Sequence, residues 1–107
     1  MDTNITVLAQ LAPAATTETV LYQVLPGNRS FINGVTVCNR SNSNRTFRLS
    51  ISLLGGATAT KDYLYYDLSL TANNTFLAEL GVTIGSPAVI RVYASSADLS
   101  FTLYGIA

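Results

Sequence analysis

The stretch "KDYLYYDLSL", residues 61–70, gathers side chains that could do chemistry: two carboxylates and three of the six tyrosines. Paired carboxylates can serve a glycosidase, but the odd spacing of Asp62 and Asp67 would place them on opposite faces of one strand. The chain has no histidine, which excludes Ser-His-Asp and Cys-His arrangements. With Cys38 as its single cysteine it also lacks the usual zinc ligands. We therefore expect no enzymatic activity, no metal site and no cofactor.

The tyrosines of this stretch divide between two faces if it forms a regular strand. Alternation puts Tyr66 on the leucine face, as a core residue, and turns Tyr63 and Tyr65 outward. Tyr93, on another alternating segment, is expected to lie near them. Exposed tyrosine is common at protein interfaces and also stacks on sugars. Partner contact through Tyr63, Tyr65 and Tyr93 is our interpretation, with a sugar platform and simple cross-strand packing left open.

Three of the arginines fall in or beside "NRSNSNRTFR", residues 39–48. Arg40, Arg45 and Arg48 fit either a solvated turn or a contact with an acidic partner surface, because guanidinium groups pair well with carboxylates. Six basic and six acidic residues give the chain a net charge of zero. Nucleic-acid binding normally relies on a broad basic field, so we expect none here.

Composition points to a single domain that associates with other proteins. The chain has 107 residues, of which 49% are hydrophobic and 11% charged, against about 25% charged in an average soluble domain. A surface with so few charges and no net charge favours association; the alternative is a small separate domain whose surface is kept polar by serine, threonine and asparagine. No apolar run approaches the roughly 18 residues of a membrane-spanning helix, so we expect no membrane insertion.

A period of two dominates the chain. Hydrophobic and polar residues alternate in "RTFRLSISLL" (45–54), "AVIRVYAS" (88–95) and "LSFTLYGI" (99–106), as in half-buried strands. About eight such segments, separated by turn residues, predict an all-β fold: a single antiparallel β-sandwich, jelly-roll-like. Asn33-Gly34 is compatible with a hairpin turn or with a bulge inside one strand. The expected core comprises Phe47, Leu49, Ile51, Tyr66, Leu68, Ile90, Val92, Phe101 and Leu103.

The first 17 residues differ from the rest, since they contain no basic residue and end in the small-residue stretch "PAATT". Asp2 replaces the basic start of a secretory signal, so we do not expect one. We divide the chain into an N-terminal arm, 1–17, and a β-sandwich domain, 18–107. The arm is either a frayed terminus with one edge strand or a segment that adds to a neighbouring subunit's sheet.

Several segments resemble one family. "PAATT", "VCN", "TFRLSI", "YLYYD", "RVYAS" and "SFTLYG" are similar to segments of small virion structural proteins of tailed bacteriophages, over roughly residues 12–106. The resemblance implies a capsid cement (decoration) protein, made in the bacterial host cytoplasm and carried in the virion. It would bind between capsomers, to the major capsid protein and to its own copies, as a homotrimer. The alternative is a tail or fibre-associated sandwich that binds host-surface carbohydrate through Tyr63, Tyr65 and Tyr93.

Overall fold

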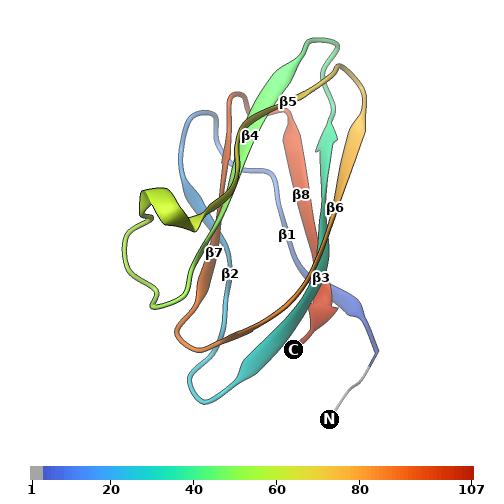
Figure 1. Ribbon diagram of the computed structural model, residues 1–107. Helices are drawn as coiled ribbons and strands as arrows, with labels where there is room; N and C mark the ends of the chain where they lie inside the picture. Colours follow the sequence, from blue (N-terminus) through green and yellow to red (C-terminus); the bar gives the residue numbers. More distant parts are fainter. Residues whose placement is uncertain (1–3) are drawn as a thin grey trace.

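Two antiparallel four-stranded sheets face each other in the computed structural model, which describes residues 4–107 (Figure 1). Sheet A has the strand order β1-β8-β3-β6, and sheet B has the order β2-β7-β4-β5. The predicted all-β sandwich of about eight strands is therefore confirmed. The elements are β1 (Thr6–Leu11), β2 (Thr19–Gln23), β3 (Arg29–Asn39), β4 (Arg45–Ser52), the short 3-10 helix η1 (Thr60–Asp62), β5 (Tyr63–Leu70), β6 (Thr75–Gly85), β7 (Val89–Ala94) and β8 (Leu99–Ile106).

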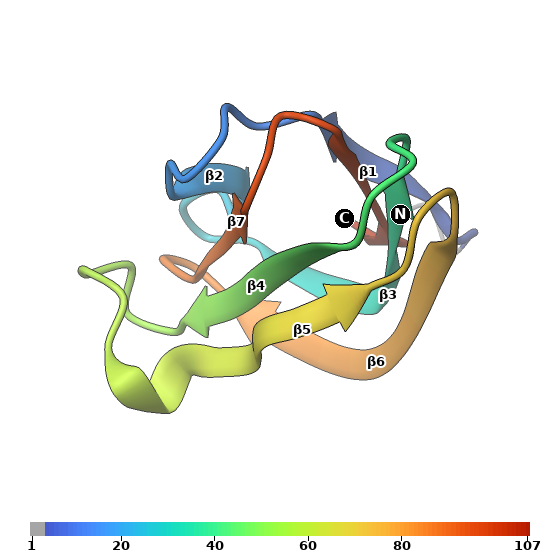
Figure 2. The same ribbon diagram turned by 90° about the horizontal axis from the view of Figure 1, so that it is seen from above.

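The chain passes from one sheet to the other at every connection except the one between β4 and β5. Within the two sheets, β1 pairs with β8, β2 with β7, β3 with β6, and β4 with β5. This nested pairing is that of one long double hairpin folded over into two layers, and the finer jelly-roll assignment stays a prediction. Figure 2 shows the fold end-on, with the strands of both sheets surrounding the core.

The inner faces of the two sheets form one hydrophobic core. Phe47 and Leu49 on β4 face Phe101 and Leu103 on β8, all with at most 1% of their surface exposed. Six of the expected core residues are buried, namely Phe47, Leu49, Ile90, Val92, Phe101 and Leu103. Ile51 and Leu68 are half-buried and pack against this core. The prediction for Tyr66 was wrong, because its side chain is 59% exposed.

A bulge in β5 explains that error. Phe47 pairs with Leu68 and Leu49 pairs with Tyr65, which leaves Tyr66 and Asp67 together opposite a single β4 residue. Asp67 adopts a left-handed backbone conformation, φ 52°, which aspartate tolerates better than most residues. An extra residue reverses the alternation of the strand on one side of it. Tyr65, not Tyr66, therefore turns toward the core. A further register shift, between Leu49 and Ser50, leaves Leu64 as an extra residue and returns Tyr63 to the outer face.

A bulge within β3 settles the ambiguity at Asn33-Gly34. β3 runs without interruption from Arg29 to Asn39, and its register against both β6 and β8 shifts between Ile32 and Gly34. The hairpin alternative is therefore wrong. A side chain at Gly34 would place its Cβ 2.5 Å from the carbonyl oxygen of Ala78, so glycine is what allows β6 to approach here.

The described part of the predicted arm lies on the chain's own sandwich. β1 forms an edge of sheet A beside β8, and the amide of Thr16 donates to the carbonyl of Ala94 at 2.8 Å. Exchange of this segment with a neighbouring subunit stays a prediction, and residues 1–3 lie outside the described residues. Within residues 4–107, no helix has the length and apolarity needed to cross a membrane.

Candidate functional site

A row of stacked planar groups crosses the outer face of sheet B. The rings of Tyr63 and Tyr66 meet edge to face, with centroids 4.9 Å apart and an interplanar angle of 84°. The guanidinium carbon of Arg48 lies 4.3 Å from the ring centroid of Tyr66 and 4.3 Å from that of Tyr93. Both distances are within the range of cation–π attraction. We call Tyr63, Tyr66, Arg48 and Tyr93 the aromatic row.

The bulge residue Asp67 fixes the position of Arg48 at the centre of the aromatic row. Its carboxylate accepts two hydrogen bonds from Arg48, at 2.7 Å from Nε and 3.3 Å from Nη2. The hydrogen bond to Asp67 raises the pKa of Arg48 above its usual value, so this guanidinium stays charged. The same left-handed turn that exposes Tyr66 thus places the carboxylate that orients Arg48 between the rings. The row is fixed in position, and the charge of Arg48 is balanced by that of Asp67.

A hollow of about 450 Å³ opens beside the end of the row, lined by Thr58, Thr60, Tyr63 and Tyr66. All four lining side chains combine a hydroxyl with apolar surface. Ser50 on β4 is paired across the sheet with Tyr63 and with Arg91. The Ser50 hydroxyl is buried and has no hydrogen-bond partner among the described residues.

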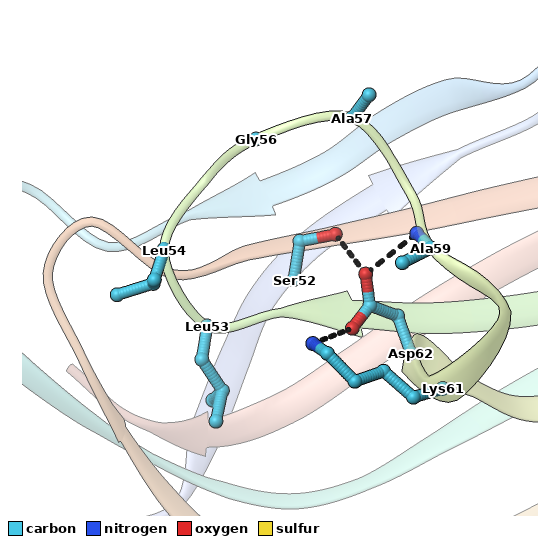
Figure 3. A pocket seen from close by; sticks show the side chains of 8 residues that line it. All are labelled: Ser52, Leu53, Leu54, Gly56, Ala57, Ala59, Lys61 and Asp62. Atoms are coloured by element: carbon cyan, nitrogen blue, oxygen red, sulfur yellow. Dashed lines mark hydrogen bonds and ion pairs between the residues drawn. The ribbon is translucent and has the colours of Figure 1, made fainter.

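The loop that supplies Thr58 and Thr60 is organised around a buried carboxylate. Asp62 accepts hydrogen bonds from the amide of Ala59 at 2.8 Å and the hydroxyl of Ser52 at 3.0 Å, and pairs with Lys61 at 3.1 Å (Figure 3). These bonds, that from the Ala59 amide above all, hold the pKa of Asp62 below its ordinary value. The carboxylate closes a smaller hollow of about 140 Å³, lined mainly by the loop that follows β4.

Arg91 ties this loop to sheet B. Its Nη1 donates to the carbonyl oxygen of Gly56 at 2.8 Å, to Ser52 Oγ at 3.0 Å and to Thr58 Oγ1 at 3.1 Å. Ser52 thus receives a bond from Arg91 and donates one to Asp62. Arg91 also holds Gly56 and Thr58, and Asp62 holds Ala59, so the wall that carries Thr58 and Thr60 is preformed.

The structure brings together some of the predicted site residues and separates others. Tyr63, Tyr93 and Arg48 belong to the aromatic row. Tyr65 does not: it packs inward against Phe47 and Phe76, at ring distances of 6.1 and 5.3 Å. Tyr66 takes the outward place that alternation assigned to Tyr65. Since Tyr66, Leu68 and Leu70 are in phase in the sequence, the pattern contains no signal of the bulge.

The other two predicted arginines lie outside the aromatic row and bind within the chain. Arg40 donates to the Ala97 carbonyl at 2.7 Å and to the Ser100 hydroxyl at 2.8 Å. Arg45 forms an ion pair with Asp98 at 3.3 Å. An acidic partner would have to compete with these bonds, and contact of Arg40, Arg45 or Arg48 with such a partner stays a prediction.

The carboxylates of the tyrosine stretch occupy different positions from those expected. Asp62 lies in η1, before the strand begins, and Asp67 lies in the bulge. Each is engaged in its own set of structural hydrogen bonds. Among residues 4–107, His, Cys, Asp and Glu side chains form no cluster of three that could hold a metal ion. The aromatic row ends in a hollow whose lining side chains all carry a hydroxyl group.

The outer face of sheet A is a second surface, which the sequence interpretation missed. The strands of this sheet contain two charged residues, Arg29 on β3 and Glu79 on β6. Leu77 on β6 is 57% exposed and Val7 on β1 is 51% exposed. Between these edges, the half-buried positions that alternate with the core residues of β3 and β8 are a mixture of polar and apolar residues: Phe31, Thr36, Cys38, Ser100, Thr102, Tyr104 and Ile106. Counting charges in each predicted strand would not have singled out these strands, because β2 in sheet B has no charged residue either, and β3 and β6 have one each, as do β5 and β7.

None of the protein families, curated proteins or solved structures compared with this chain matches it.

Proposed function

We propose that this chain is a structural subunit of a tailed-phage particle: a cement protein that binds between capsomers and stabilises the head. Its partners would be the major capsid protein and its own copies, arranged as a homotrimer. The resemblance described above supplies the biological context, and the outer face of sheet A supplies the physical argument.

The observation that carries this proposal is the low charge of that face. The cores of protein interfaces are depleted in charged residues, because each buried charge must lose its hydration. Sheet A presents Leu77 and Val7, both about half exposed, with Arg29 and Glu79 as the charged residues of its four strands. Burying such a surface against a neighbouring protein costs little desolvation and gains hydrophobic stabilisation.

The mechanism would be mass action. A protein that binds the assembled lattice, and not its separated parts, stabilises the lattice in proportion to its occupancy and affinity. A rigid sandwich suits this role because little conformational entropy is lost when a preformed surface binds.

The test introduces a charge on each face of the sandwich in turn. Leu77→Lys places an ammonium on the outer face of sheet A, and Ser69→Lys places the same group at an exposed position of β5 in sheet B. Each purified variant is first checked for an unchanged melting temperature and then added to heads that lack the protein. Bound copies per head are counted by quantitative mass spectrometry.

We expect Leu77→Lys to weaken head binding about tenfold or more, the equivalent of about 1.4 kcal/mol, and Ser69→Lys to bind like the unmodified chain. Equal binding by the two variants would exclude the outer face of sheet A as the interface. The number of copies on an intact particle tests the location: hundreds indicate the head, whereas a few to a few dozen indicate the neck or tail.

A further inference from the structure

The hollow beside the aromatic row has the composition of a small-molecule site. Two aromatic rings at 84° supply apolar surface in two directions, and Thr58, Thr60, Tyr63 and Tyr66 supply four hydroxyl groups around it. A pyranose ring has the complementary character, with a face of C–H bonds and a rim of hydroxyls. The hollow has a volume of about 450 Å³, which lies within the roughly 300–1,000 Å³ of small-molecule sites. We propose that this hollow binds an uncharged saccharide.

The charges around the hollow favour an uncharged ligand. Arg48 is paired with Asp67, and Lys61 is paired with Asp62. Arg91 donates to the carbonyl oxygen of Gly56 and to two hydroxyls. An anionic ligand would have to take a cation from these partners, whereas a saccharide only needs hydroxyl donors and acceptors, which the wall provides.

Both sides of the hollow are held in place before any ligand arrives. On one side, Arg48 lies between Tyr66 and Tyr93 and is fixed by Asp67. On the other side, Arg91 and Asp62 fix the loop that carries Thr58. Preorganised side chains lose less conformational entropy on binding, which matters most for a small ligand with few contacts.

A proline-rich peptide is the rival occupant, because aromatic grooves also bind polyproline helices. The hydroxyls favour the saccharide: a proline has no donor for Thr58 and Thr60, and a sugar has several. The proposal does not rest on the cement function, since the hollow lies on sheet B and the proposed interface on sheet A.

The experiment measures saturation-transfer NMR on the full chain with maltotriose, cellotriose, chitotriose and a deca-proline peptide, each at millimolar concentration. Three variants probe the hollow: Tyr63→Ala removes a ring, Tyr66→Phe removes one hydroxyl, and Thr60→Val removes a hydroxyl at nearly constant shape. Thr83→Val makes the last change at an exposed position of β6 in sheet A and serves as the matched control. Melting temperatures establish that each variant is folded.

We expect at least one trisaccharide to bind. Tyr63→Ala should weaken it about threefold to tenfold, Thr60→Val and Tyr66→Phe should weaken it measurably, and Thr83→Val should have no effect. No transfer to any of the trisaccharides, transfer unaffected by Tyr63→Ala and Thr60→Val alike, or binding of the peptide alone would each overturn the proposal. Head binding by Tyr63→Ala, measured alongside, reports separately on the cement function.

Discussion

The surroundings of Asp62 resemble those of a catalytic acid, but its hydrogen bonds stabilise the loop that follows β4. It is buried, its carboxylate lies beside a hollow, and its pKa is displaced from the ordinary value. The displacement is downward, because the bonds from Ala59, Lys61 and Ser52 favour the charged form. A general acid needs the opposite shift to hold its proton near neutral pH. The geometry therefore assigns Asp62 to loop structure.

This assignment predicts a pH-dependent stability. A folded-state pKa below the ordinary 3.8 means that the contribution of Asp62 is complete above that pH and is lost as the pH falls through the lowered value. Asp62→Asn should lower the melting temperature at neutral pH and reduce the further decrease seen between about pH 5 and pH 2. Circular dichroism melts across this range measure both effects. Glu18→Gln, at an exposed position before β2, is the charge-removal control, and parallel curves for the unmodified chain and Asp62→Asn would contradict the assignment.

Neighbouring tyrosines on β5 should differ sharply in their effect on stability. Tyr65 packs against Phe47 and Phe76 in the core, so Tyr65→Ala should cost about 2–4 kcal/mol of unfolding free energy. Tyr66 is 59% exposed, and Tyr66→Ala should cost about 1 kcal/mol or less, mainly through its contact with Arg48. Urea unfolding measures both. If Tyr66→Ala were the more damaging change, the bulge would have to be absent.

At the scale of single strands, the alternation of hydrophobic and polar residues predicted the core residues correctly where strand pairing is regular. It gave wrong predictions where a bulge interrupts the pairing. Phe47, Leu49 and Phe101 were predictable because successive strand residues face opposite sides. Tyr65 and Tyr66 were not, because the bulge depends on which β4 residues lie opposite and on the pairing of Asp67 with Arg48. Both are contacts between strands, and the local sequence of β5 does not encode them.

Because β8 lies between β1 and β3 in sheet A, we predict that position 105 on this strand requires glycine. A side chain at Gly105 would place its Cβ in overlap with the carbonyl oxygen of Phe31 and 2.9 Å from Leu8 Cδ1. Gly105→Ala should therefore separate β8 from β3 and β1 and destabilise the domain by about 1–3 kcal/mol or more. Gly56→Ala is the control, because its Cβ would have no neighbour within 4 Å. Chemical denaturation of both variants measures the difference, and equal stability would mean that the sheet can widen at little cost.

The molecule is flattened, with extents of 41 × 29 × 19 Å along its principal axes, and its two sheets differ in the number of charged residues on their strands. Sheet A has two charged residues on its strands, whereas sheet B has four: Arg45, Arg48, Asp67 and Arg91. Composition alone predicted a protein that associates, but not the face involved. Which strands share a sheet is decided by pairings such as β1 with β8, which join opposite ends of the chain. The candidate surfaces therefore required the structure.

The asymmetry of the faces predicts how association responds to salt. Between about 0.1 M and 1 M salt the screening length falls from about 10 Å to about 3 Å, which weakens contacts between exposed charges. If copies and shell bind through the outer face of sheet A, the dissociation constant should change little over this range, because the strands there carry only Arg29 and Glu79. If Arg40, Arg45 and Arg48 contact an acidic partner instead, binding should weaken severalfold. Sedimentation of the protein with purified heads at both salt concentrations separates the two. A steep loss of binding at high salt would indicate that the interface is formed by the arginines and not by the outer face of sheet A.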